Sequence, residues 1–412
     1  MTATRLLKAA TIVLLAAGWV VAAALLWRTK IPGDLSLPKL GSSAFFSGAE
    51  RHRAEHFESV AGLLYLARIA AELAILAVLA LLGRRLARGF ALGEIGAGVM
   101  IAVAANLFIW LAGLPLGLLG HWWDRRYGLA KRSYWSYVEQ QTLGLLVQTA
   151  VVAIVLAVIM VIARALPRRW WLVTAPLFLG VAVLLIVLLA LLAPVGTHPI
   201  RDRQVAAAAK QLERREGVPG TKIRVDDVDE ETNAVNAQMV GLGPTNVVIL
   251  WNTLFRSLSD DAVEFVIGHE LGHAARRHIP KGIAWGLLFS LPLTFLLAEA
   301  TRRRGGIQRA AVVPYALFVS AVLGLLSAPL QNVVSRRYEA EADWMALQAT
   351  KDPAAGREVF RSFTRIDLAD PNPPLWSYVL LDTHPTVMQR LAMTRAWEAR
   401  RARKDGRSPE GS

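Results

Sequence analysis

The main pattern along the chain is a series of long apolar runs separated by polar stretches. A transmembrane helix needs about 20 mainly apolar residues, and seven runs come near that length. The sixth run is the shortest. The runs cover, approximately, residues 6–27, 60–83, 95–119, 142–163, 170–192, 282–297 and 311–330. The pattern predicts a mainly α-helical, polytopic membrane protein with about seven transmembrane helices.

The first run begins at Leu6 and ends at Trp27. Basic residues precede it, and no clear small-residue cleavage site follows it. A retained membrane anchor is therefore favoured over a cleaved signal peptide.

Two polar blocks lie outside the apolar runs. The first covers about residues 196–281 and the second about residues 331–412, and the last two runs form a membrane hairpin between them. We expect a membrane region over residues 1–195 with five helices. A second domain is expected over 196–396, interrupted by the hairpin at about 282–330, and residues 397–412 are expected to be a disordered basic tail.

Composition supports the membrane class and limits the chemistry. Hydrophobic residues make up 54% of the chain and charged residues 19%, whereas soluble domains are less apolar and more charged. The net charge of +14 does not indicate nucleic acid, because the arginines gather at the ends of apolar runs, where they anchor and orient spans. Cysteine is absent, so a metal site must use His, Asp or Glu.

Basic residues near the ends of the spans bear on orientation. With seven spans, four clusters fall on one side, which the positive-inside rule makes cytoplasmic. The polar block is then expected outside the cytoplasm. The protein as a whole is expected in the cell (plasma) membrane. Loops on the opposite side are also basic, so the sequence leaves the side of the site open. The four clusters are Arg5 and Lys8; Arg84, Arg85 and Arg88; Arg164, Arg168 and Arg169; and Arg302, Arg303, Arg304 and Arg309.

The stretch "EFVIGHELGHAARRH", residues 264–278, holds three of the eight histidines. His269 and His273 are four apart, so on a helix both imidazoles reach one ion, and Glu270 beside them can take a proton from water. Ser259 or Asp260 is the expected N-cap. Gly268 and Gly272 are unfavourable in a helix, which indicates that another backbone or a substrate approaches closely. A helix with incidental histidines is the alternative.

A catalytic zinc ion requires a third protein ligand, and the segment from Asn332 to Ala349 offers candidates. Glu339 and Asp343 share a helical face, so Glu339 can bind the ion while Asp343 accepts a hydrogen bond from a ligating imidazole. Glu341 points elsewhere on the helix and is the competing ligand. A solvated acidic face is the alternative for either residue alone.

Together, "GHELGHAARRH" and "SRRYEAEAD" resemble the type I CAAX prenyl proteases, which are integral-membrane zinc metallopeptidases. The resemblance implies a zincin-like metalloprotease domain with a small β-sheet and one Zn²⁺ ion. It implies zinc binding by His269, His273 and Glu339 and makes Glu270 the general base. Further implied positions are a second-layer aspartate at Asp343 and an additional histidine, His278, on the same helix as the ligand pair.

Two other segments are similar to the family's, and the resemblance extends over nearly the whole chain. In "VNAQMVGLGPTNVVILWNTLF", the pair Asn236 and Ala237 begins an edge strand that holds substrate backbone in the family, and "NVVIL" has strand composition. In "THPTVMQRL", the resemblance makes His384 the donor to the oxyanion and places Arg390 beside the metal site.

These features predict a zinc metalloendopeptidase that acts on membrane-associated, possibly lipidated, peptide substrates. C-terminal CAAX-type processing and quality control of membrane proteins are the two enzymatic alternatives. A transporter, channel or scaffold with a decayed site is a rival from another class. Its support is the intramembrane pair Arg68 and Glu72, which also suits a structural ion pair or the lining of a cavity. The oligomeric state does not follow from the sequence.

Overall fold

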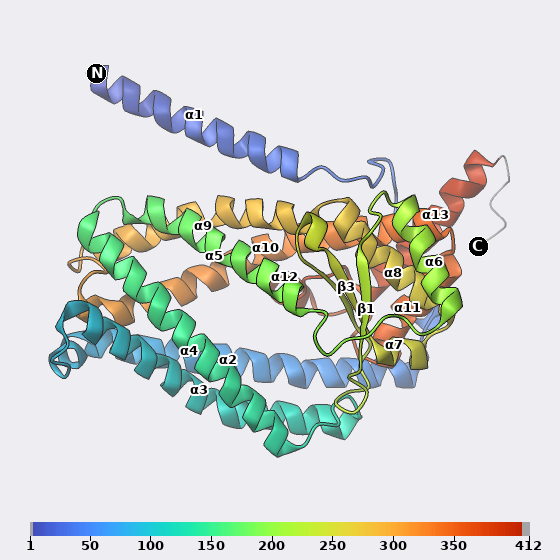
Figure 1. Cartoon of the computed structure of the whole chain (residues 1–412), viewed down its shortest axis with the longest axis horizontal. Helices are drawn as coiled ribbons and strands as arrows, with labels where there is room; N and C mark the ends of the chain where they lie inside the picture. The colour runs from blue at the N-terminus through green and yellow to red at the C-terminus, as the bar shows by residue number, and fades with distance from the viewer. Residues whose placement is uncertain (1–2, 406–412) are drawn as a thin grey trace.

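The computed structural model describes residues 3–405, without the side chains of residues 3–12, 14 and 15. Long helices extend to one side of a smaller domain that contains the only sheet in this described part (Figure 1). The long apolar helices are α1 (Ala3–Leu26), α2 (Gly48–Arg88), α3 (Gly93–Tyr127), α4 (Tyr134–Ala165), α5 (Trp170–Leu192), α9 (His278–Arg302) and α10 (Val313–Thr350).

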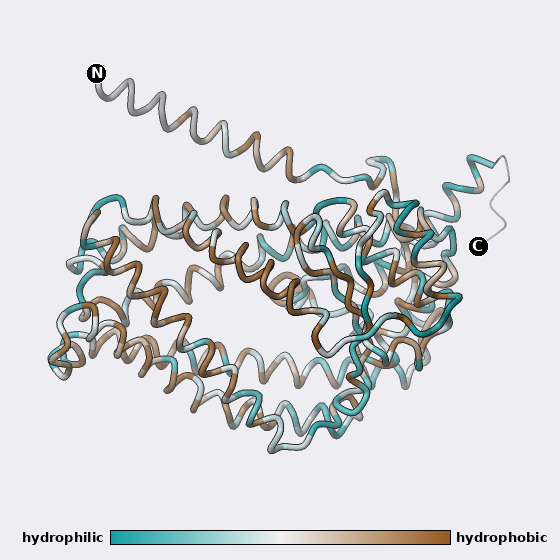
Figure 2. The backbone as a smooth tube through the Cα atoms, viewed as in Figure 1, coloured by the Kyte–Doolittle hydropathy of each residue, from teal (hydrophilic) through white to brown (hydrophobic). Residues whose placement is uncertain are grey.

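Six of these helices, α2 to α5, α9 and α10, are long and apolar enough to cross a membrane. The chain is therefore a multi-pass integral membrane protein. Hydrophobic residues dominate these helices in Figure 2, while α6 and the end of α13 are mainly hydrophilic. The first predicted run coincides with α1, whose described apolar part is the shorter stretch Ala16–Leu26. The seventh span thus stays a prediction.

A small sheet and short helices make up the smaller domain. The strand order is β1-β3-β2, with β3 parallel to β1 and antiparallel to β2, so β2 is an edge strand, as predicted. Two 3₁₀ turns lie at Ser42–Ala44 and Gly243–Thr245, and a third, Ala310–Val312, lies between α9 and α10, outside this domain. The remaining elements are α6 (Arg203–Arg215), β1 (Lys222–Asp226), β2 (Ala237–Val240), β3 (Val247–Trp251), α7 (Asn252–Ser257), α8 (Asp260–Ala275), α11 (Pro353–Arg365), α12 (Leu375–Leu380) and α13 (Val387–Lys404).

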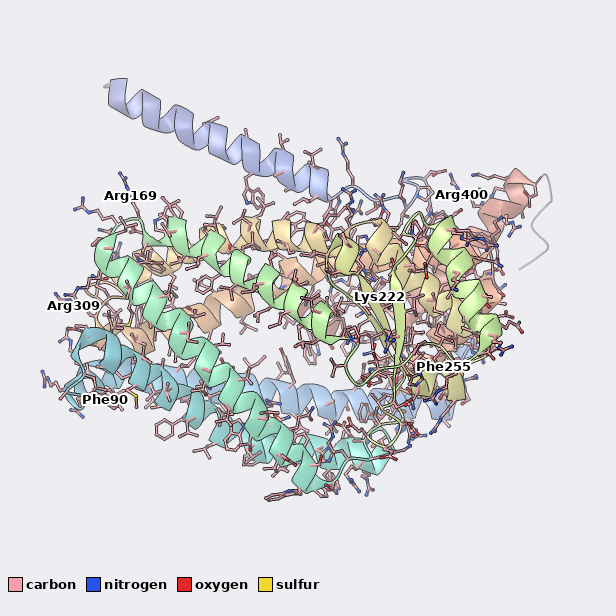
Figure 3. All side chains as sticks on the ribbon, in the orientation of Figure 1. Phe90, Arg169, Lys222, Phe255, Arg309 and Arg400 are labelled. Atoms are coloured by element: carbon pink, nitrogen blue, oxygen red, sulfur yellow. The ribbon has the colours of Figure 1, made fainter. Side chains whose placement is uncertain are left out.

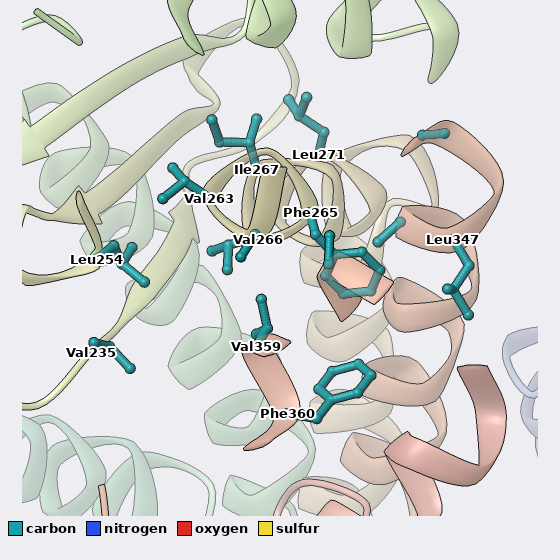
Figure 4. Packing of buried hydrophobic residues seen from close by; sticks show 14 of the residues in the cluster. Val235, Leu254, Val263, Phe265, Val266, Ile267, Leu271, Leu347, Val359 and Phe360 are labelled. Atoms are coloured by element: carbon teal, nitrogen blue, oxygen red, sulfur yellow. The ribbon is translucent and has the colours of Figure 1, made fainter. Parts of the chain in front are cut away.

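The core of this domain surrounds α8. Phe265 packs edge-on against Phe360 of α11, with ring centroids 5.6 Å apart, and both side chains are fully buried. Ile267 and Leu271 point to other sides of α8 and are also buried (Figure 4). This core explains why α8 is rigid enough to carry a site, since apolar neighbours surround it on most of its circumference.

Two expectations about element boundaries are wrong. His278 does not lie on the ligand helix, because α8 ends at Ala275 and Arg277 has left-handed backbone angles (φ 53°, ψ 46°), so His278 begins α9. The basic tail is not disordered from residue 397, because α13 continues to Lys404 and Trp397 is buried in the core. Residues 406–412 of that tail lie outside the described part.

The basic turns between spans lie at one end of the molecule. Arg169 and Arg309 are at the end of the membrane helices, and Lys222 and Phe255 are in the sheet domain at the other end (Figure 3). The turns at Arg169 and Arg309 thus share one end, as predicted, and the side of the membrane that this end faces stays a prediction. Arg68 and Glu72 line a cavity between α2, α3 and α4, and no ion pair joins them in the described residues.

Candidate metal centre and substrate cleft

The ligand helix α8 begins at a well-defined cap. The Ser259 hydroxyl accepts a hydrogen bond from the Ala262 amide, which confirms it as the N-cap. Glu358 accepts hydrogen bonds of 2.7 Å from the amide and from the hydroxyl of Ser259. Such a cap satisfies orphan amides at the helix start and fixes where the helix begins relative to α11.

The two glycines of the motif allow α10 to approach α8 closely. A Cβ atom added at Gly272 would lie 3.0 Å from Cβ of Met345, and one added at Gly268 would lie 3.4 Å from Cα of Ala346. The predicted close approach is thus made by the backbone of α10. It brings the carboxylates of α10 next to the histidines of α8.

His269, His273 and Glu339 converge on one point. Nε2 of His269 lies 3.1 Å from Nε2 of His273, and Oε2 of Glu339 lies 3.2 Å from Nε2 of His269. Oε2 of Glu339 is buried and makes no hydrogen bond with any described residue. Three electron-rich atoms in such proximity, one of them buried and unsatisfied, suit a cation that they share. The donor set of two imidazoles and one carboxylate is the type that binds zinc in catalytic sites.

Behind this cluster, one set of hydrogen-bonding residues positions His269. Oδ1 of Asp343 lies 2.9 Å from Nδ1 of His269, and Arg390 donates two hydrogen bonds of 2.6 and 2.8 Å to the Asp343 carboxylate. The guanidinium also lies over the rings of Phe360 and Phe363. If the imidazole donates Nδ1–H to Asp343, its Nε2 lone pair points to the shared centre.

A second set of hydrogen-bonding residues positions His273. Nδ1 of His273 lies 3.0 Å from Nδ1 of His278, and Nε2 of His278 lies 3.0 Å from Oε2 of the fully buried Glu341. Glu341 also accepts hydrogen bonds from Arg276 (2.6 Å) and from the Lys30 amide (2.7 Å). Glu341 thus faces away from the cluster, on the side of His278, and does not converge with the two histidines of the motif.

Sequence reasoning missed several residues that contact His278 and Glu341 in this second set. The Tyr338 ring stacks on His278 with centroids 4.6 Å apart, and its hydroxyl donates to the Leu26 carbonyl. Lys281 lies 3.8 Å from Glu341. The position of Tyr338 directly before Glu339 was a usable signal that its side chain lies near the site. The contact between Glu341 and Lys30 joins residues far apart in the chain, and no local pattern reveals it.

Charges in the site favour a cation and a neutral-pH base. Burial opposes the protonated form of His269, but the neighbouring carboxylates of Asp343 and Glu339 outweigh it and raise the pKa of His269 to about 10. The local field therefore attracts positive charge. Burial raises the pKa of Glu270 to about 7, a value suited to a group that accepts and returns a proton near neutral pH.

A cleft of about 530 Å³, including open solvent, borders this cluster at His269. Asn236 and Ala237, at the start of β2, line it together with His384, and their contact with a substrate stays a prediction. Nε2 of His384 lies 3.2 Å from Oε2 of Glu339, and its side chain is 56% exposed. The other lining residues are Val235, Leu254, Leu258, Phe265, Val266, His269, Glu270, Val359, Ser362, Phe363 and Arg390.

Two family models cover most of the chain. Residues 199–398 match peptidase family M48, and residues 49–196 match the N-terminal region of the CAAX prenyl proteases, described as five membrane helices. The chain belongs to peptidase family M48. The predicted resemblance to the type I CAAX prenyl proteases is confirmed, and the cluster described above lies in the M48 part.

Relatives and a solved structure agree with this family. The uncharacterized metalloprotease YhfN of Bacillus subtilis is 24% identical over 69% of this chain and 70% of that protein. CAAX prenyl protease 1 of Saccharomyces cerevisiae is 26% identical over 45% of this chain and 42% of that protein. The crystal structure of S. mikatae Ste24p is 19% identical in sequence and superposes with a TM-score of 0.71. The match covers 91% of this chain and 96% of the Ste24p chain, so the fold is the same. This M48 chain is therefore a membrane metalloprotease.

Proposed function

We propose that this chain is a zinc-dependent endopeptidase that hydrolyses peptide bonds of substrates held at the membrane. The observation that carries the proposal is the convergence of His269, His273 and Glu339, beside a cleft that His269, Glu270 and His384 line. The proposed peptidase domain comprises residues 196–396, and the α9–α10 hairpin is inserted in it. The proposed location of the whole protein is the plasma membrane.

Zinc bound by His269, His273 and Glu339 would polarise the scissile carbonyl and acidify water. Glu270 takes the proton of the attacking water and passes it to the leaving amine, because its pKa of about 7 permits both transfers. His384 donates a hydrogen bond to the oxyanion from the rim of the cleft. Asp343 and Arg390 keep His269 in one tautomer and one orientation.

The edge strand gives a way to hold the substrate. A peptide that pairs with β2 extends the sheet through main-chain hydrogen bonds, with Asn236 and Ala237 at one end of the pairing. Gly241, just after β2, packs close to Ala190 of α5. Because the end of β2 borders a membrane helix in this way, a substrate with a lipid or membrane anchor that pairs with β2 has a short path from the bilayer.

The closest functional candidate is C-terminal processing of lipidated proteins, since the relatives include proteins named CAAX prenyl protease 1. Quality-control proteolysis is the alternative. Purified protein, stripped with a chelator and then supplied with Zn²⁺, would be assayed on isoprenylated and plain peptides of the same sequence. We expect zinc to restore hydrolysis, with the isoprenylated peptide preferred. Zinc-independent hydrolysis would refute the zinc proposal, and many internal cuts in unmodified proteins would favour quality control.

A further inference from the structure

A second cavity beside the cleft is lined by arginines. Arg357, Arg361 and Arg365 are spaced four apart on α11 and therefore share one helical face, and Arg395 of α13 is the fourth. The cavity encloses about 1190 Å³, including open solvent. We call it the arginine pocket. Phe360, also on α11, faces the core against Phe265 (Figure 4), so α11 separates the core from this pocket.

The arginine pocket is contiguous with the substrate cleft. Leu258 and Ser362 line both cavities. These two side chains therefore lie between a ligand in the cleft and the arginines. The location implies a role in substrate binding more than a separate surface site.

Positive charge in the pocket is incompletely balanced. Arg357 and Arg395 share Glu398, at 2.7 and 3.5 Å, and Arg365 reaches Glu50 at 2.7 Å. The carboxylate of Glu358, which also lines the pocket, already accepts both hydrogen bonds from Ser259.

Arg361 is the exception among the four arginines. It has no ion pair or hydrogen bond with any described residue, and its Nε is buried without a partner. Like charges four apart on a helix repel, and a buried donor without an acceptor is unfavourable. An anionic ligand with two acceptor oxygens would relieve both, because guanidinium groups bind carboxylates in a bidentate manner.

The direction of a bound peptide indicates which anion arrives there. A strand that pairs antiparallel to β2, the more stable arrangement, runs toward Ala237 as it proceeds to its C-terminus. Val235, Asn236 and Ala237 line the same cleft as Leu258. The N-terminal part of the peptide then lies toward Gly241 and the membrane helix α5.

We propose that the arginine pocket, with Arg361 as its principal donor, binds the C-terminal carboxylate of the peptide substrate. This inference rests on the proposed peptidase function and adds that the enzyme recognises a free C-terminus a few residues beyond the cleaved bond. An extended peptide advances about 3.3 Å per residue, so only substrates with a short tail place their carboxylate in the pocket.

The test compares free and amidated C-termini. A peptide library would be cut by the full-length, zinc-loaded protein, and the best-cut sequence would be prepared as the acid and as the amide. We expect the wild-type protein to prefer the acid by about tenfold in kcat/KM, as for loss of one charge-assisted hydrogen-bonded pair. In Arg361→Ala the kcat/KM of the acid should fall to the level of the amide, while a melting transition in detergent as cooperative as that of the wild type shows that the protein is folded.

Matched variants sharpen the outcome. Arg361→Lys should restore part of the preference, because it keeps the charge and loses the fork. Arg214→Ala, an exposed arginine on α6, should keep all of it. Equal cleavage of acid and amide by the wild type, or a preference that survives in Arg361→Ala, would overturn the carboxylate site and leave the peptidase function standing. Failure to cut either form would contradict the proposed function, and this inference with it.

Inorganic phosphate serves to identify an anion site unrelated to substrate. If about 10 mM phosphate raises the melting temperature of the wild type but not of Arg361→Ala, and acid and amide are cut equally, the pocket binds free anions or lipid phosphate, and the carboxylate proposal is wrong. Selective inhibition of cleavage of the acid by phosphate would support it.

Discussion

Nδ1 of His273 lies 3.0 Å from Nδ1 of His278, which in turn reaches the buried Glu341. The second histidine of the motif is therefore held by an imidazole, whereas the first is held by a carboxylate. Donation of Nδ1–H from His273 to His278, and of Nε2–H from His278 to Glu341, leaves the Nε2 lone pair of His273 free for a metal.

This relationship predicts the effect of His278→Ala on zinc binding. We expect zinc affinity to fall by about 10- to 100-fold, as when partners behind metal ligands are removed. Competitive titration with a chelator measures it. His52→Ala, which replaces an exposed histidine on α2, is the control. An unchanged zinc affinity in His278→Ala would show that the His273–His278 contact does not orient the ligand.

Gly272→Ala should loosen the contact between α8 and α10. The added methyl group would lie 3.0 Å from Cβ of Met345, and such overpacking costs about 1–3 kcal/mol. We expect a lower melting temperature in detergent and weaker zinc binding. Gly282→Ala is the control, because a Cβ there meets no atom within 4 Å. A melting temperature equal to that of the wild type would mean that α10 can shift without cost.

Arg390→Gln should destabilise the folded domain. It leaves the fully buried Asp343 without its cation, and breaking a buried pair costs about 3–5 kcal/mol. The double variant Arg390→Gln/Asp343→Asn should recover part of that loss in thermal unfolding, because no buried charge remains unpaired. If the double variant is as unstable as the sum of the singles, the pair is not the source of the effect.

Asp367 gives the domain a pH dependence. Burial raises its pKa to about 7, although the hydrogen bond from the Val235 amide (3.0 Å) opposes the shift. The unfolded value is near 3.9, so the protonated carboxyl stabilises the fold fully below about pH 4, and this contribution is lost as the pH rises through 7.

Asp367→Asn tests this dependence. The difference in melting temperature between the variant and the wild type should be small at pH 5 and should grow in favour of the variant by pH 8. Asp261→Asn, an exposed position, should show no such trend. A difference that does not change with pH would contradict the raised pKa of Asp367.

The sequence was most informative where a pattern repeats over many residues. Apolar runs predicted six helices that the structure contains, and the spacing of His269 and His273 placed both on one helical face. The two motif glycines predicted the approach of another backbone. These inferences rest on local periodicity, which the folded chain preserves.

Long-range features were less accessible. The break at Arg277 depends on a single left-handed residue that is not a glycine, so no turn signal marks it. The role of Glu341 depends on Lys30, more than 300 residues away. The arginine spacing on α11 was visible in the sequence, but its proximity to the cleft follows only from the packing of α7, α11 and α13.

Zinc content and peptide hydrolysis measured on one sample of Glu270→Gln test the central claim most directly. The substitution removes the proposed proton acceptor and leaves His269, His273 and Glu339 in place. We predict one zinc ion per chain, as in the wild type, and loss of hydrolysis by at least about 100-fold. Full hydrolysis by the variant, or absence of zinc from a folded wild-type protein supplied with the ion, would contradict the proposed mechanism.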